Sequence, residues 1–158
     1  KEARLQNLMN GYSKLEEMTD DFIAIQVTER SRIEIKLLPL INNTHIVCLI
    51  RTAYGPVPDS QLSFYTTDWE PIANNGMFTP TSPEWFYKEK IDKNDPTFQF
   101  IQARLDMCLF KYSLSGDSNT LTVEYTTPLY LNKEEQQKAA AFLKDTPRTY
   151  VWKASRFE

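Results

Sequence analysis

The chain has 158 residues, of which 41% are hydrophobic, 13% aromatic and 25% charged, and its formal net charge is -3. This is a globular composition with extra Phe and Tyr, so it excludes a disordered chain, and the interspersed charges exclude the basic patch that nucleic acid needs. No apolar run approaches the roughly 20 residues that cross a bilayer.

The N-terminal segment has helical spacing. Apolar side chains recur at Leu5, Leu8 and Met9, and Gly11 is placed to end a helix over residues 1–10. After Gly11 the apolar period changes to two, which predicts that the next segments are strands.

The clearest alternation lies on both sides of the polar turn at residues 29–31. Its apolar members are Ile23, Ile25, Val27, Ile33, Ile35 and Leu37. The spacing predicts a hairpin in which these six side chains share one buried face while Glu34 and Lys36 point to water.

The elements that follow include one strand that is apolar on both faces, at residues 45–52, as expected at the centre of a sheet. Two prolines argue against ladder pairing at residues 54–59. The remaining predicted elements are a strand at 61–67, a long connection at 71–96, short helices beginning at 83 and 96, a hairpin over 105–114 and 120–127, a helix from Asn132 to about Lys144 and a strand at 150–152.

These elements predict an α+β fold, with antiparallel sheet and a few packed helices in one domain over residues 1–158. An internal match at constant offset relates residues 48–51 to 108–111 and residues 65–67 to 125–127. It leaves open a degenerate duplication, with related units at 1–72 and 96–158 joined by the proline- and aromatic-rich connection. We expect Cys48 and Cys108 to be buried thiols in equivalent strands rather than a disulfide.

Residues suited to catalysis are scarce. The chain has one histidine, His45, two cysteines and four scattered glycines, so no metal site, cofactor site or nucleophilic triad is predicted. Four carboxylates at Glu16, Glu17, Asp20 and Asp21 are typical of a solvated loop, but they keep open an enzyme that uses carboxylates on a glycan.

A group of aromatic residues in or beside the long connection is the best candidate for a binding site. Its members are Tyr54, Trp69, Phe78, Trp85, Phe86 and Tyr87. Either these rings cover the sheet, or some remain exposed as a recognition surface, because rigid aromatic side chains provide contact area at low entropic cost.

Several blocks resemble one known family. They are Met18–Ile23, Ile35–Pro39, Phe64–Trp69, Leu105–Met107 and Tyr125–Pro128, which span most of the chain. They are similar to an uncharacterised family of Bacteroidales proteins, domain of unknown function 3256. The resemblance implies a periplasmic or secreted protein whose signal peptide has been removed, with a lipid anchor as a further option, and it brings no catalytic residues.

The sequence does not identify a function. We expect a non-enzymatic protein that binds a protein or glycan partner in the cell envelope. The alternatives are the carboxylate-dependent enzyme and a structural subunit of an envelope complex.

Overall fold

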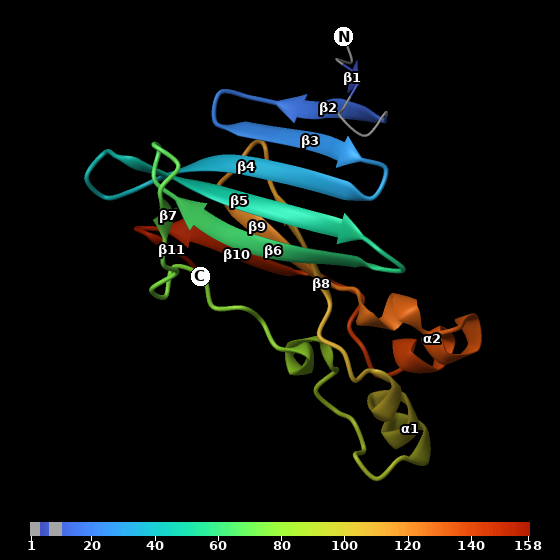
Figure 1. The fold of residues 1–158 in the computed structure, drawn as a ribbon. Coiled ribbons are helices and arrows are strands. Elements are labelled where there is room, and N and C mark those ends of the chain that lie inside the picture. The colour runs from blue at the N-terminus through green and yellow to red at the C-terminus, as the bar shows by residue number, and fades with distance from the viewer. Residues whose placement is uncertain (1–3, 7–10) are drawn as a thin grey trace.

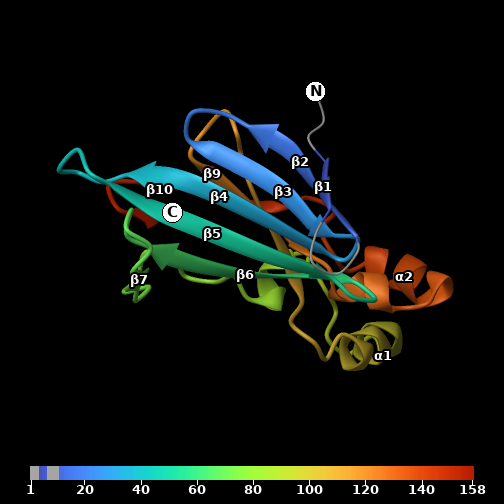
Figure 2. The same ribbon diagram turned by 45° about the horizontal axis from the view of Figure 1, so that its top comes forward.

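A computed structural model describes residues 4–6 and 11–158, which form two antiparallel sheets packed face to face with helices at one end (Figures 1 and 2). The large sheet has seven strands in chain order: β1 (Arg4–Gln6), β2 (Tyr12–Met18), β3 (Phe22–Thr28), β4 (Ser31–Pro39), β5 (His45–Tyr54), β6 (Pro58–Tyr65) and β7 (Pro71–Ile72). The small sheet has the order β11 (Arg156–Phe157), β10 (Arg148–Lys153), β9 (Thr120–Tyr125) and β8 (Phe110–Leu114).

The helices are short and lie together beside one end of the small sheet (Figure 1). They are η1 (Pro83–Phe86), α1 (Pro96–Arg104), η2 (Thr127–Tyr130) and α2 (Lys133–Ala140). Two predicted caps are present: the Asp95 carboxylate accepts a hydrogen bond from Thr97 N, and the Asn132 side chain accepts one from Glu135 N. The predicted α+β class is confirmed.

The N-terminal helix prediction is wrong where the structure describes it. Arg4–Gln6 are a strand that pairs antiparallel with β2, and the rest of residues 1–10 lies outside the described part. Pairing with residues 12–14 stabilises a strand here, whereas a short helix with no packing partner is only marginally stable in water.

The predicted hairpin of β3 and β4 forms, but it presents the opposite face to the core. Ile23 lies opposite Ile35, so the six apolar residues do share one face. That face, however, points away from the small sheet. Glu34 and Lys36 lie between the sheets instead, with 2% and 1% of their surfaces exposed. The prediction that they point to water is therefore wrong.

Both buried charges have an oppositely charged partner, although the Oε2 atom of Glu34 accepts no hydrogen bond within the described residues. Lys36 Nζ lies 3.2 Å from an Asp21 carboxylate oxygen and donates to the Ser115 carbonyl at 3.1 Å. A Glu34 carboxylate oxygen lies 2.8 Å from the Arg32 guanidinium. Burial raises the pKa of Glu34, and Arg32 offsets only part of that effect. Paired in this way, the two charges can occupy an interior that would exclude them singly.

The core between the sheets follows the expected alternation on the remaining strands. Cys48 and Ile50 of β5 are fully buried, and they face side chains from β9 and β10 such as Leu121 and Trp152. On the other side of the small sheet, Thr122 is half-buried and Glu124 is exposed. The prediction of an apolar central strand at residues 45–52 is confirmed.

Side chains of β6 close the corner where the two sheets meet. The backbone N–H groups of Phe110 and Tyr112 donate to the side chains of Asp59 at 3.2 Å and Ser60 at 3.0 Å. β6 begins at Pro58, which pairs with Tyr54 of β5, so the prediction that residues 54–59 form no ladder is wrong at both ends of that segment. A proline that lacks an N–H is acceptable as the first residue of a strand.

The two cysteines occupy different environments, and both are free thiols. Cys48 is buried within β5, where desolvation raises its pKa, whereas Cys108 is exposed and precedes β8. The prediction that both thiols are buried in equivalent strands is wrong for Cys108, because the segment between α1 and β8 is irregular.

Candidate functional site

The surface of the large sheet that points away from the small sheet is unusually apolar, and we call it the outer face. Its apolar residues, from strands β1 to β5, are Leu5, Leu15, Met18, Ile23, Ile25, Val27, Ile33, Ile35, Leu37, Val47, Leu49 and Ala53. Val47 and Leu49 are buried, and the others are half-buried or exposed, with 73% exposure at Leu5 and 70% at Met18.

Strand pairing aligns these residues in rows across the sheet. One row contains Ile25, Ile33, Arg51 and Gln61, and the next contains Ile23, Ile35, Leu49 and Ser63. The outer face is therefore apolar on β3 and β4 and becomes polar towards β6.

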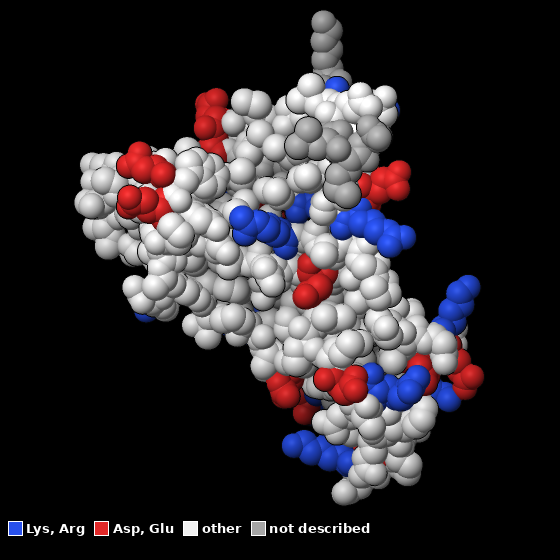
Figure 3. Space-filling view, in the orientation of Figure 1, with Lys and Arg blue, Asp and Glu red and all other residues white. Residues whose placement is uncertain are grey.

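The outer face is large enough to have a role. Five strands spaced by about 4.8 Å and six residues of about 3.3 Å each give roughly 500 Å². Apolar patches of about 300–600 Å² are the largest on ordinary monomers and are often functional. Figure 3 shows this side of the molecule, where a few charged side chains interrupt a largely uncharged surface.

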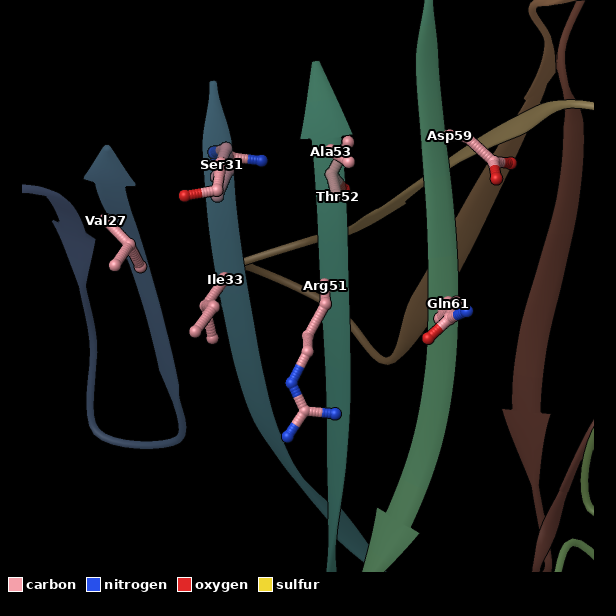
Figure 4. Close-up of a pocket in the computed structure, with 9 residues that line it drawn as sticks. Val27, Ser31, Ile33, Arg51, Thr52, Ala53, Asp59 and Gln61 are labelled. Atoms are coloured by element: carbon pink, nitrogen blue, oxygen red, sulfur yellow. The ribbon is translucent and has the colours of Figure 1, made fainter. Parts of the chain in front are cut away.

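A hollow of about 330 Å³ lies on this side, at the end of the sheet where β5 ends and β6 begins. Its lining combines apolar side chains with a few polar ones: Val27, Ser31, Arg32, Ile33, Arg51, Thr52, Ala53, Asp59 and Gln61. Figure 4 shows Arg51 on the near side of β5, beside Ile33 of β4 and across from Gln61 of β6. Ligand sites of this size commonly pair an apolar floor with a few fixed polar groups.

Two arginines of the hollow differ in their partners. Arg32 is held by the carboxylates of Glu16 and Glu34. Arg51 is exposed, and in the described part of the chain no carboxylate lies within ion-pair distance of it. Asp59 points away from Arg51 in Figure 4, towards β8, where it accepts the hydrogen bond from Phe110 N.

Most of the aromatic residues that the sequence suggested as a site are part of the packing. Phe78 is 4% exposed and makes edge-to-face contacts with Tyr112 and Tyr150, and Phe86 is 2% exposed and stacks on Tyr125. These two rings close one side of the sandwich and cannot contribute to a recognition surface.

Trp85 and Tyr87 are half-buried. The Lys144 ammonium lies 4.4 Å from the centre of the Trp85 ring, and the Tyr87 ring packs edge-to-face on Phe98. Their neighbours therefore come from the fold itself, which favours a covering role for both rings.

Trp69 is the most exposed of the six, at 54%, and adopts a left-handed φ of 64° in the turn between β6 and β7. Its ring lies 5.8 Å from that of Tyr65, which belongs to the outer face. Tyr54 lies at the other end of β6, roughly 23 Å away at about 3.3 Å per residue. The structure therefore joins Trp69 to the outer face but does not bring it together with Tyr54.

Two of the four carboxylates suggested for acid–base chemistry are engaged in ion pairs. Glu16 contacts Arg32, and Asp21 contacts Lys36. The hydrogen bonds from Lys36 and Thr19 outweigh desolvation and lower the pKa of Asp21, so this carboxyl is ionised at neutral pH and unsuited to act as a general acid. Within the described residues no three His, Cys, Asp or Glu side chains gather as a metal site requires.

Sequence reasoning missed the outer face and Arg51. The signal was present in the alternation of β3 and β4, but the period of two does not say which face is covered. Arg51 follows an apolar run in β5 and carries no motif. Only the pairing with Ile33 and Gln61 places it on the apolar surface.

The comparisons with known proteins give a family but no activity. Residues 1–157 match the family model described as "Protein of unknown function (DUF3256)". The structure is similar to that of a domain of an uncharacterized protein from Porphyromonas gingivalis W83, with a TM-score of 0.91 and 30% sequence identity over 100% of this chain and 80% of that chain.

No curated protein matches the chain. None of the helices in the described part is long and apolar enough to span a membrane. The family match covers nearly the whole chain, and the chain belongs to the DUF3256 family of proteins of unknown function.

Proposed function

We propose that this protein is a non-enzymatic binding module of the cell envelope that takes an apolar ligand on its outer face. The observation that carries the proposal is the arrangement of β4, where Ile33, Ile35 and Leu37 face outward while Glu34 and Lys36 are buried. Leaving these apolar side chains half-exposed to water costs stability, in proportion to the apolar area that is not buried. A ligand that covers the outer face would offset that cost.

The hollow at the end of the outer face supports a small-molecule ligand. Its volume of about 330 Å³ falls within the usual range for such sites. The ion pairs of Glu16 and Asp21 and the lowered pKa of Asp21 weigh against a carboxylate-dependent enzyme built on these two groups, because an acid–base pair needs one carboxyl that stays protonated near neutral pH. The envelope location rests on the family resemblance.

A single charge placed on the outer face tests the proposal. Ile35→Lys should fold and lose no more than about 1 kcal/mol, because a half-buried position lets the lysine head reach water. Nile red, an uncharged apolar dye, should brighten with the parent protein and lose most of that increase with Ile35→Lys. Fluorescence titration measures the binding, and thermal unfolding measures the stability.

Thr122→Lys is the matched control, since it adds the same charge to the solvent side of the small sheet. It should bind the dye as the parent does. Unfolding of Ile35→Lys would show that the position is part of the core, and unchanged dye binding would show that the dye sits elsewhere. Either result contradicts the proposal.

A further inference from the structure

Arg51 is a charged residue at the border of an apolar surface. Across the strands its neighbours are Ile33 and Gln61, and along β5 on the same face they are Leu49 and Ala53. None of these four side chains carries a charge. Within the described part of the chain Arg51 forms no ion pair, in contrast to Arg32 in the same hollow.

The guanidinium is also well placed for a ligand. It lies on the open side of the sheet, where Figure 4 shows it beside Ile33. The amide of Gln61 lines the same hollow and can donate a further hydrogen bond, whereas the Ser31 hydroxyl there is already hydrogen-bonded to Thr28 Oγ1 at 2.6 Å. Arginine binds carboxylates and phosphates with two parallel N–H donors, and such charge-assisted bonds are stronger near apolar surroundings than in water.

We propose that the ligand of the outer face is an amphiphile with an anionic head group, whose carboxylate or phosphate binds Arg51 while its hydrocarbon chain lies along the apolar rows of β3 and β4. Charge complementarity selects this class over an uncharged or cationic amphiphile. This inference rests on the proposed function, and it adds the sign of the head group and the place where that group binds.

Three dodecyl probes on the parent protein test the head group. They are dodecanoate, dodecyl maltoside and dodecyltrimethylammonium, each used as monomers below its micelle concentration and measured by calorimetric titration. We expect dodecanoate to bind about tenfold more tightly than the maltoside, as one charge-assisted hydrogen-bonded pair would give. The cationic probe should bind more weakly than the maltoside. A fourth arm with dodecyl phosphate distinguishes a phosphate head from a carboxylate head.

Arg51→Gln tests the position. The side chain is exposed, so the variant should unfold at the parent's temperature. Within this variant, the roughly tenfold ratio between the dissociation constants of the maltoside and dodecanoate should fall to about one. Lys153→Gln removes one positive charge from an exposed site on β10 and serves as the control, which should keep the parent's ratio.

The outcomes separate this inference from the proposed function. Equal dissociation constants for dodecanoate and the maltoside, or an anion preference that persists in Arg51→Gln, would overturn the role of Arg51 while leaving apolar binding in place. Failure of all four probes to bind would count against both proposals.

Discussion

Replacing Trp152 with alanine is expected to cost about 3–5 kcal/mol of unfolding free energy. The side chain is 6% exposed and packs between Phe64 of the large sheet and Phe157 of β11, with ring centres 6.1 Å and 5.0 Å away. Its indole N–H also donates to the Pro39 carbonyl at 2.7 Å, so one residue joins the two sheets by packing and by a hydrogen bond. Urea unfolding followed by circular dichroism measures the change.

Val151→Ala is the control for Trp152, because it truncates the adjacent residue, which points to the other side of β10 and is 40% exposed. It should change the unfolding free energy by no more than about 0.5 kcal/mol. Equal effects of the two substitutions would mean that the small sheet does not pack on the large sheet through this face.

The second large effect is expected at Ile50. Ile50→Ala should cost about 2–5 kcal/mol, because the side chain is fully buried between the sheets. Ile35→Ala removes the same atoms from the outer face and should cost only about 1 kcal/mol, because the side chain is half-buried there. Urea unfolding of both variants under one set of conditions gives the comparison.

The ratio of the two losses in unfolding free energy, at Ile50 and at Ile35, shows which face of the large sheet is the core. A cost at Ile35 equal to or above that at Ile50 would mean that the outer face is covered within the folded chain. The proposed ligand surface would then not exist.

The sequence predicted features that depend on neighbouring residues. Asp95 followed by Pro96, and Asn132 followed by Glu135, are start signals of helices that need no knowledge of the rest of the chain, and both are present. The alternation at β3 and β4 likewise predicted the hairpin and the six apolar residues that share a face, because a period of two belongs to a strand in any context.

The orientation of that hairpin could not be predicted, because it depends on distant residues. Glu34 and Lys36 favour an exposed face when taken alone. Their burial depends on Arg32 and Asp21 nearby and on the Ser115 carbonyl, which is far away in the sequence. The orientation of the hairpin depends on the groups that neutralise these charges. A hydropathy pattern contains no information about those groups.

The aromatic residues of the candidate site were also predicted in part, because the sequence shows where they gather but not which of them are buried. The gathering of aromatic residues was visible in the sequence, but the contacts that bury Phe78 come from β8 and β10, and those that bury Phe86 come from β8 and β9. Trp69 is exposed because it occupies a turn, where among the described aromatic rings its own ring contacts that of Tyr65 alone. The packing of the two sheets therefore decides which of these loop aromatic residues are buried, and the local sequence does not.

The central claim is that the outer face of the large sheet is the ligand surface, and isoleucine methyl NMR tests it most directly. In a titration of the folded protein with dodecyl maltoside, the methyl signals of the outer-face residues Ile23, Ile25, Ile33 and Ile35 should shift together. The signals of Ile46 and Ile50, buried between the sheets, and of Ile101, buried where α1 packs on α2, should stay in place. Shifts confined to the buried methyl groups, or no shift at the four outer ones, would contradict the account.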